Sequence, residues 1–412
     1  MMPPLQSVFL FLSTSLLLGA YDIPDRSKDQ FLSEKGYLVI PAPYSMPGIG
    51  EGYVLYGGIN NYLGHSDFFA MKTNGDAEGE LLGAWDVHVI PRTLFFDITY
   101  LNFSKTGINS YAGRGMDSGK NDYSVAVFDY MESLSVDSTL SFWERRLEVQ
   151  LSHYRQSVRM TSLKNPDGSL LAEFADPQTR FSSNWNIQML LDLTDDRQDP
   201  RKGIRFYLQG SRSAPEKDFD PDFYTLTWNT TAYIPVFSQS TLALHYQRSD
   251  SQMIREGEVD FDAVAAELGY DCSLGCSGEI ENEILNRIAY NRHGNAASMG
   301  GEGALRSYPG DRFTAAHSQL AGAELRFNFS AEREPIDIFF MKDIRTGLQL
   351  AFFHEVATVS DARSDLWDTT RSSSGVGLRL IMGSGFVYRF DYASGDEGAE
   401  MTIFVSYPWE GW

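Results

Sequence analysis

The strongest constraint on the fold is a period of two in the side chains, repeated through most of the chain after its first fifty residues. In the run 94–103, Phe96 and Ile98 share one face, while Asp97 and Thr99 share the other. Successive side chains of a β-strand point to opposite faces of the sheet. The pattern therefore predicts an all-β protein built from amphipathic strands.

The same alternation recurs in residues 224–234 and 378–392. The apolar positions of the last predicted strand are Met401, Ile403, Val405, Tyr407 and Trp409. A soluble sandwich buries such a face, whereas a transmembrane barrel turns it toward lipid. Runs of about ten residues match the tilted span of a bilayer. Aromatic residues gather near the strand ends, and short turns alternate with long polar loops. These features favour a transmembrane antiparallel β-barrel.

Breaks in the alternation set the strand count. Short turns are predicted at 91–92, 134–138, 195–203, 235–240, 330–342 and 383–385, and longer connections at 105–121, 161–179, 214–221, 251–316, 357–371 and 394–399. They delimit about fourteen strands, with room for one more hairpin in 62–80 or 255–298. An outer-membrane barrel needs an even number, with its short turns on the periplasmic side.

Composition and the N-terminus point to an exported membrane protein. Lys and Arg total 34 against 55 Asp and Glu, a net charge of −21, which argues against binding to nucleic acid. The longest apolar run, 8–20, is too short for a transmembrane helix. Its position predicts a signal peptide at 1–20. A short periplasmic entry segment (21–50) and the barrel (51–412) are predicted to follow.

Residues 251–298 interrupt the alternation. The spacing in 259–268 and 279–290 is helical, which predicts a partly helical insertion within a loop. Cys272 and Cys276, the two cysteines of the chain, lie between these segments. In an oxidising compartment they would form a disulfide, and free thiols are the alternative. A zinc site would need further ligands, and the chain has no second cysteine pair.

Several stretches together resemble the BamA-like outer-membrane barrel superfamily, also called the bacterial surface-antigen family. Met299–Tyr308 is similar to the family's glycine pair, here Gly300 and Gly301, followed by its Val/Leu-Arg-Gly-Phe/Tyr motif, here Leu305-Arg306-Ser307-Tyr308. Residues 352–359 are similar to the strand that carries a Phe-x-Asp motif, here Phe353-His354-Glu355. Residues 195–203 are similar to an Asp-Pro-Arg-Arg-Gly turn, and 375–412 to the last three strands.

This resemblance covers residues 37–412 and implies sixteen strands, two more than the direct count. It also implies that the motif loop enters the lumen, where Arg306 pairs with Glu355 beside Phe353. A guanidinium in a confined lumen needs a carboxylate, because an unpaired buried charge costs about 3–5 kcal/mol. Ser307 replaces the motif glycine and Glu355 replaces the aspartate. The alternative places both charges in water.

The C-terminal aromatic residues have a second implied role. Outer-membrane barrels commonly end in an aromatic strand that serves as the signal for insertion, and Tyr407, Trp409 and Trp412 resemble that signal. Aromatic residues of a plain closing strand, at the membrane interface, are the compatible alternative.

The resemblance implies a factor that inserts or translocates outer-membrane proteins or lipids, by opening laterally between the first and last strands. Outer-membrane lipids and client barrel proteins are the implied partners. The thirty or so residues before the barrel leave no room for the family's periplasmic POTRA domains, so a separate periplasmic partner is also expected. The alternatives are a passive pore, a surface antigen that binds through residues 251–298, and a barrel hydrolase.

Enzyme motifs are missing from the sequence. The seven histidines form no His-Glu-x-x-His pattern, and there is no Gly-x-Ser-x-Gly segment or phosphate-binding loop. The acidic run 250–262 lacks the glycine of a calcium-binding EF-hand loop. We therefore predict no enzyme activity, no cofactor and no metal site. A hydrolase whose catalytic side chains come from neighbouring strands would leave no such motif.

Overall fold

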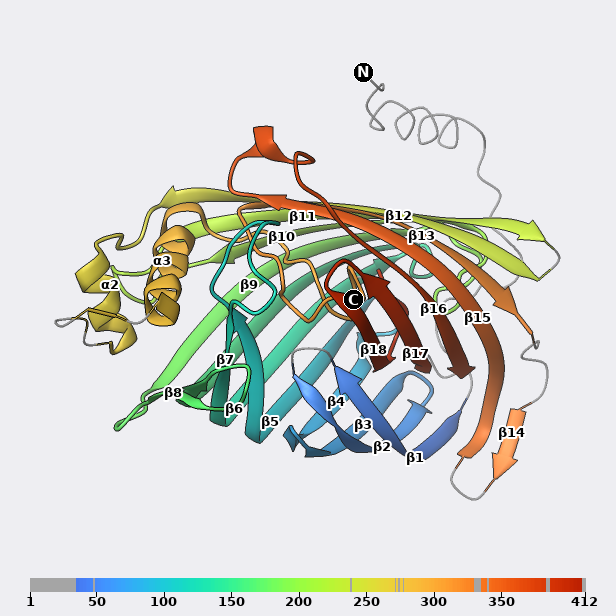
Figure 1. The fold of residues 1–412 in the computed structure, drawn as a ribbon. Coiled ribbons are helices and arrows are strands. Elements are labelled where there is room, and N and C mark those ends of the chain that lie inside the picture. The colour runs from blue at the N-terminus through green and yellow to red at the C-terminus, as the bar shows by residue number, and fades with distance from the viewer. Residues whose placement is uncertain are drawn as a thin grey trace.

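The computed structural model describes residues 35–46, 49–237, 239–270, 272, 275–276, 278–329, 335–338, 341–382 and 386–409. They form one antiparallel sheet that closes into a barrel (Figure 1). The predicted fold class is therefore confirmed. The predicted signal peptide and Trp412 lie outside the described residues. No helix among the described residues is long and apolar enough to cross a membrane.

The described residues form eighteen strands. Two of these are four-residue strands that pair beside β7 and β15, which leaves sixteen strands in the wall. The wall strands are β1 (Gly36–Met46), β2 (Gly50–Tyr62), β3 (Ser66–Gly75), β4 (Glu78–Ile90), β5 (Leu94–Tyr111), β6 (Tyr123–Phe142), β7 (Leu147–Lys164), β9 (Thr179–Asp192), β10 (Gly203–Ser213), β11 (Asp222–Phe237), β12 (Ser240–Arg255), β13 (His317–Asn328), β15 (Met341–Ser360), β16 (Arg371–Met382), β17 (Phe386–Gly395) and β18 (Gly398–Val405). The short strands are β8 (Leu170–Glu173) and β14 (Pro335–Ile338).

Two expected boundaries were wrong. The segment predicted as an entry segment contains β1, so the barrel begins at Gly36 rather than at residue 51. The turn predicted at 134–138 lies inside β6, where Asp137 pairs with Asp97 of β5. The polar residues of this stretch belong to a strand because the polar face of the barrel lines its lumen. The true turn is at 143–146, where three residues have positive φ.

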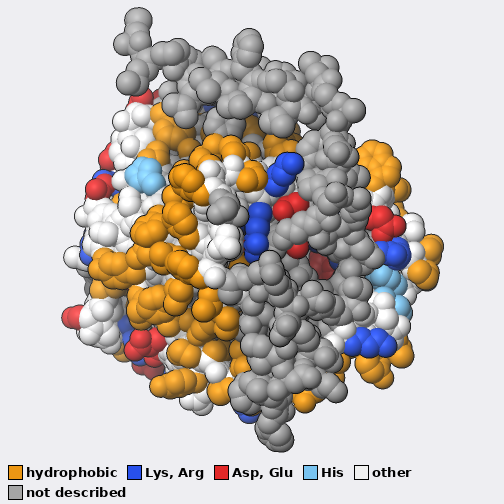
Figure 2. Space-filling model, turned by 90° about the vertical axis from the view of Figure 1, so that its right-hand side faces the viewer, with side chains coloured by type: hydrophobic (Ala, Val, Ile, Leu, Met, Phe, Trp, Pro, Cys, Tyr) orange, Lys and Arg blue, Asp and Glu red, His pale blue; other side chains and the backbone are white. Residues whose placement is uncertain are grey.

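The side chains divide as in a membrane barrel. Large apolar residues are exposed on the outside, among them Leu55, Ile98, Leu151, Ile187, Leu226 and Leu378. Figure 2 shows hydrophobic side chains gathered over much of the surface, on the side that lies to the right in Figure 1. Charged residues such as Arg326, Arg379 and Glu324 are buried inside. The apolar face of the sheet is therefore turned outward.

The long connection between β12 and β13 carries a helical cap. Helices α2 (Phe261–Leu268) and α3 (Gly278–His293) form where the spacing predicts them, and a short 3₁₀ helix (Arg363–Asp365) follows β15. Val264 and Ile284 are the buried centre of the cap. Cys272 and Cys276 are joined by a disulfide between the two helices.

Candidate functional site

The motif loop between β12 and β13 lies inside the barrel. Gly300 and Gly301 have φ values of 116° and 99°, a conformation that side-chain-bearing residues rarely adopt. Gly301 N–H donates to the carbonyl of Tyr308 at 2.9 Å, and Gly300 N–H donates to that of Ala304 at 3.0 Å. The glycine pair thus closes a tight loop that presents Arg306.

Arg306 is fully buried and contacts three carboxylates of the barrel wall. Its Nε donates to Glu355 Oε1 at 3.1 Å, and its backbone N–H donates to Glu355 Oε2 at 3.0 Å. Its Nη1 donates to Glu324 at 3.1 Å and to Asp391 at 2.8 Å. The guanidinium also lies 3.3 Å from the centre of the Phe353 ring. We call Arg306, Glu324, Glu355 and Asp391 the Arg306 cluster.

The cluster joins the loop to three strands of the wall, and Arg379 adds a fourth strand. Glu324 is on β13, Glu355 on β15 and Asp391 on β17. On β16, Arg379 binds Glu324 through two parallel hydrogen bonds of 2.7 and 2.6 Å. Arg326 adds a third bond to Glu324 at 2.7 Å. Bidentate arginine–carboxylate pairs have a narrow geometry. The loop is therefore held to a rigid part of the wall.

Charge balance keeps Arg306 ionised. Burial lowers the pKa of the guanidinium, but Glu355, Asp391 and Glu324 outweigh this effect and raise the pKa above its ordinary value. Desolvating these groups is costly, so the cluster is weak evidence for net stability. Removing Arg306 alone would leave carboxylates buried without their partner.

Ser307 and Tyr308 fasten the loop to β16 and β17, in the same part of the wall. Ser307 N–H donates to Ser373 Oγ at 3.0 Å, and Tyr308 is fully buried. A Cβ atom at Gly395 of β17 would lie 2.4 Å from Ser307 Oγ. The space that Ser307 occupies is therefore provided by a glycine in the wall.

Residues 406–409 turn into the barrel instead of continuing the last strand. β18 stops at Val405, Ser406 has φ 107°, and Tyr407 and Trp409 are buried. Trp409 Nε1 donates to Glu355 Oε1 at 3.0 Å, and its indole stacks on His245 of β12 at 5.0 Å. The strand predicted to continue through Trp409 is therefore shorter. The role of these aromatic residues as an insertion signal stays a prediction.

The turn at 195–203 receives the other tail residue. Asp199 is buried and accepts a hydrogen bond from the Tyr407 hydroxyl at 2.8 Å. Burial raises the pKa of Tyr407 well above its ordinary value, and the Asp199 carboxylate raises it further, so the hydroxyl stays a neutral donor. The sequence predicts a turn at 195–203, and the structure also shows this turn bound to the tail.

The closure of the barrel is unusual. Among the described residues, the ladder between β1 and β18 consists of the pair Ser45↔Ile403. Nearer its start, β1 pairs with β15 at Tyr37↔Lys342 and Leu38↔Met341. Leu38, on the inward face of β1, packs on the outward side chains of the last strands. The barrel thus closes in two ways, by one backbone ladder pair and by packing of β1 side chains on the outer face of the last strands.

This seam overlap consists of Leu38, Ile40 and Tyr56 on one side and Leu380, Tyr388 and Val405 on the other. The first three share the inward face of β1 and β2. The second three are neighbours across β16, β17 and β18, on the face opposite to Arg379 and Arg389. β1 therefore lies outside the end of β18.

Two prolines explain why β1 and β18 do not pair further. Pro41 and Pro43 have no N–H, yet both lie within the ladder to β2, so they fill positions where β1 does not donate to β2. The backbone carbonyls of Pro41 and Pro43 therefore point toward the seam. Ser45, two residues after Pro43, has the same orientation and pairs with Ile403. The carbonyl of Pro43 accepts a hydrogen bond from the Tyr388 hydroxyl at 2.8 Å, a side-chain bond in place of a ladder bond.

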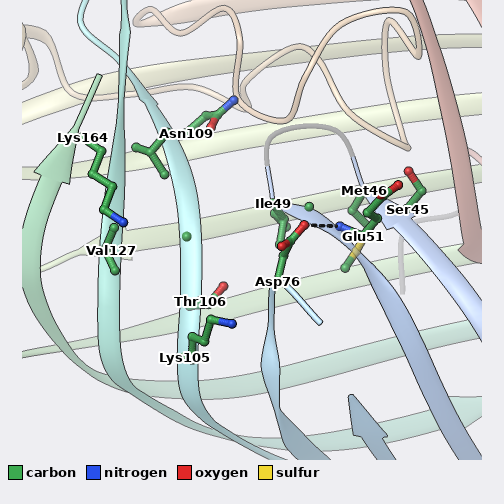
Figure 3. A pocket seen from close by; sticks show the side chains of 13 residues that line it. Ser45, Met46, Ile49, Glu51, Asp76, Lys105, Thr106, Asn109, Val127 and Lys164 are labelled. Carbon is green, nitrogen blue, oxygen red and sulfur yellow. Dashed lines mark hydrogen bonds between the residues drawn. The ribbon is translucent and has the colours of Figure 1, made fainter. Parts of the chain in front are cut away.

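A cavity of about 570 Å³ lies at the ends of β1–β3 and β5–β7 (Figure 3). Lys105, Lys164, Glu51 and Asp76 line it together with apolar side chains. Asp76 accepts a hydrogen bond from the backbone N–H of Glu51 at 2.9 Å. No group of three or more His, Cys, Asp or Glu side chains in the described part of the chain could hold a metal ion.

A model of the Omp85 superfamily domain matches residues 98–400 of this chain. The chain belongs to the Omp85 superfamily. It is an outer-membrane β-barrel protein, as the sequence predicted. A comparison with curated protein sequences finds no match.

Solved Omp85 structures are similar over most of the chain at low identity. BamA from Haemophilus ducreyi lacking POTRA domains 1–3 is 14% identical, with a TM-score of 0.48, and the match covers 90% of this chain and 70% of that one. CdiB from Escherichia coli is 12% identical, with a TM-score of 0.48, and CdiB from Acinetobacter baumannii is 10% identical, with a TM-score of 0.47. Both matches cover 90% of this chain and 61% and 60% of the CdiB chains.

Sequence analysis missed several members of the site. Glu324, Arg326 and Arg379 were not selected, although each lies at an inward position of a strand that is otherwise apolar on its outer face. Charged residues at such positions are the signal that could have found them. Asp391 and Arg389 lie within 375–412, the range that resembles the family's last three strands. Nothing in the sequence predicted that they contact the loop.

Proposed function

We propose that this Omp85 protein inserts or translocates outer-membrane proteins or lipids by opening the barrel between β1 and β18. The observation that carries the proposal is the seam, which combines the ladder pair Ser45↔Ile403 with an apolar overlap. A backbone ladder in a bilayer is costly to break because lipid offers no hydrogen bonds. An apolar contact is exchanged for lipid at little cost.

The Arg306 cluster supports this proposal because it braces the barrel beside the seam. Glu324, Glu355 and Asp391 fix β13, β15 and β17 to the loop. Trp409 shares Glu355 with Arg306, so the tail that follows β18 is tied to the same anchor. β18 can then stay in place while β1 moves.

A disulfide across the seam provides the test. Paired antiparallel residues lie about 5.5 Å apart at Cα when hydrogen-bonded, within the range that a disulfide spans. The chain would be depleted and replaced by the variant Ser45→Cys/Ile403→Cys, and the other barrel proteins of the membrane would be quantified. We expect them to fall together under oxidising conditions and to recover after reduction.

A matched disulfide in the regular wall is the control. Ile98 and Val136 are paired on β5 and β6 and share the outward face. The variant Ile98→Cys/Val136→Cys should rescue in both redox states. If the seam disulfide also rescues fully when oxidised, lateral opening is refuted.

The rival with a specific observation in its favour is a passive pore, because the charged side chains of Lys105 and Lys164 line a cavity. Depletion that leaves every other barrel unchanged, together with single-channel conductance of the purified protein, would favour this rival. We propose no enzyme activity. An ester-hydrolysis screen of the purified barrel would detect the hydrolase alternative.

A further inference from the structure

Strands β5, β6 and β7 extend beyond the strands on either side of them. The ladder between β4 and β5 ends at Lys105, whereas β5 continues to Tyr111 and stays paired with β6. The ladder between β9 and β7 ends at Arg159, whereas β7 continues to Lys164. The extension is therefore a small three-stranded sheet with two edges. An edge strand presents a row of N–H and C=O groups that can pair with another strand.

The chain itself covers the β7 edge. The four-residue strand β8 pairs antiparallel with β7, from Ser162↔Glu173 to Lys164↔Leu170. The β5 edge has no such cover, because residues 106–111 pair with β6 alone in the described part of the chain. The β5 edge thus resembles the β7 edge with β8 removed.

Two residues of β5 direct their backbone groups to this edge. Ala112 N–H donates to the carbonyl of Asp122 at 3.2 Å, on the β6 side. Alternate residues of a strand turn their backbone groups to opposite neighbours. Gly107 and Asn109 therefore turn their N–H and C=O groups away from β6. Next along the edge, the Tyr111 carbonyl already accepts a hydrogen bond of 2.7 Å from the side chain of Asn286 on α3.

This edge lies outside the hydrocarbon layer. The carboxylate of Glu132 on β6 accepts hydrogen bonds from the Tyr100 and Tyr130 hydroxyls at 3.2 and 3.1 Å, on the outward face. A carboxylate at such a position marks the end of the lipid-facing band. Glu132 pairs with Asn102, and Gly107 is five residues further along β5, roughly 15 Å of strand. The edge is therefore in water, on the side of the long loops.

The cavity of Figure 3 lies against the edge. Gly107 and Asn109 line it from β5, and Ile49 lines it from the turn between β1 and β2. Val125 and Val127, which pair with Asn109 and Gly107, line it from β6. A strand beside β5 turns alternate side chains to the same face. Every second side chain of such a strand would therefore enter a cavity with an apolar wall.

The cavity also holds charges without ion-pair partners. Lys105 is paired with Glu78, but no ion pair in the described part of the chain engages Lys164, Glu51 or Asp76. Figure 3 shows Lys164 on one side of the cavity and the two carboxylates on the other. Complementary charges give specificity to a contact. A segment that carries an acidic side chain toward Lys164 fits this arrangement.

We propose that the β5 edge at Gly107 and Asn109 binds a short extended segment of another polypeptide outside the membrane. The segment pairs antiparallel with β5 as β8 pairs with β7. It turns apolar side chains to Val125 and Val127 and an acidic side chain to Lys164. Backbone pairing identifies the partner as a polypeptide, because only an extended chain supplies donors and acceptors at the strand spacing. The site does not depend on lateral opening of the seam.

Peptide selection tests the site. Short random peptides displayed on phage are selected on the full chain in nanodiscs and counter-selected on Asn109→Pro. This substitution removes an N–H that points away from β6, so the β5–β6 ladder keeps its bonds. We expect peptides with alternating apolar residues and an acidic residue, and Asn109→Pro should weaken binding of the synthesised peptide about tenfold or more. No enrichment over Asn109→Pro would overturn the proposal.

Matched variants separate the backbone from the side chains. Asn109→Ala keeps the N–H, so it should bind the selected peptide as wild type does. If it weakens binding as much as Asn109→Pro, the edge is not the binding element and the proposal fails. Lys164→Gln should weaken the acidic peptide and leave its amide counterpart unaffected. Equal loss with both peptides would refute the role of Lys164. Electrophoretic mobility of the folded barrel checks each variant.

Methyl groups on the peptide backbone test the pairing itself. Only alternate amides of an added strand face β5. Methylation of one alternate set should abolish binding, whereas methylation of the other set should be tolerated. The amides of Gly107 and Asn109 should also exchange hydrogen more slowly when the peptide is bound. Equal effects of the two methylated sets, or unchanged exchange at both amides, would show that the peptide does not add a strand to β5.

Discussion

Strands β5 and β6 share a ladder from Leu94↔Leu140 to Tyr111↔Tyr123, whereas β1 and β18 share the pair Ser45↔Ile403. The strands differ in length as well, with 18 and 20 residues in β5 and β6 against 11 and 8 in β1 and β18. Both regions consist of antiparallel strands. They differ in which backbone donors are available.

This difference shows how a stable barrel can still have one strand boundary, the seam, that opens more easily than the others. Between β5 and β6, backbone N–H and C=O groups pair along most of the ladder. Separating these two strands would leave many of the groups without hydrogen bonds in lipid. At the seam, Pro41 and Pro43 remove two donors, and side chains hold the strands instead. The Arg306 cluster lies in the lumen and holds β13, β15 and β17, on the β18 side of the seam, to the motif loop.

The largest effect is expected from Arg306→Ala. This change leaves Glu324, Glu355 and Asp391 buried around a missing cation, and we expect it to destabilise the barrel by about 3–5 kcal/mol. Urea unfolding, followed by the electrophoretic mobility of the folded barrel, measures it. The matched control is Arg159→Ala, which breaks the exposed pair with Asp129 and should change the stability far less.

A double-mutant cycle shows whether Arg306 and Glu355 act together. Each single alanine variant should be destabilised, and the double variant should lose clearly less than the sum of the two. A double variant that costs the full sum would mean that the two residues do not interact. That result would leave Glu324 and Asp391 as the carboxylates that hold the Arg306 guanidinium.

Next in size is the tail contact. Trp409→Phe keeps an aromatic ring near His245 but removes the N–H donor to buried Glu355. We expect a loss of about 1–3 kcal/mol. Measured in the same urea assay, a stability equal to wild type would show that the tail is not coupled to the Arg306 cluster.

A gain of stability at the seam is the third expectation. The double variant Pro41→Val/Pro43→Val restores two N–H donors on the seam edge of β1. In the register Ser45↔Ile403, position 43 comes opposite Val405, the last residue of β18, so one new bond to β18 can form, at about 0.5–1.5 kcal/mol. Hydrogen exchange of the β18 amides should slow by up to about tenfold. Pro235→Val, the same substitution in β11, should leave β18 unchanged. Unaltered β18 exchange in the double variant would contradict the role given to the prolines.

The smallest effect concerns the mouth of the barrel. Arg114 binds Asp361 at 2.7 Å. Burial alone raises the pKa of Asp361, but the hydrogen bonds and charge of Arg114 outweigh it and bring the pKa below its usual value. A lowered carboxyl pKa contributes stability above the unfolded pKa, near 4, that is lost as the pH falls through the folded pKa. Asp361→Asn should therefore melt lower than wild type at pH 7, and the difference should shrink below pH 4.

Much of the fold followed from periodicity, and the pair Arg306 and Glu355 followed from a resemblance to known motifs. Both depend on local sequence. The overlap at the seam did not follow, because Leu38 looks like any inward residue of a strand until its contact with Val405 is known. The tail was missed for the same reason, since Tyr407 and Trp409 continue the alternation of β18 in sequence. Their inward course depends on Asp199 and Glu355, which are distant in the chain.

The overlap has a consequence for the order in which the barrel is built. Trp409 lies in the lumen, and β1 lies outside the end of β18. The seam overlap requires that the outward side chains of Leu380, Tyr388 and Val405 stand together before Leu38 can pack on them. We therefore expect β1 to dock after β16, β17 and β18 have paired with one another. The end of β18 is then held from both sides, by β1 from outside and by the bond from Trp409 to Glu355 from inside.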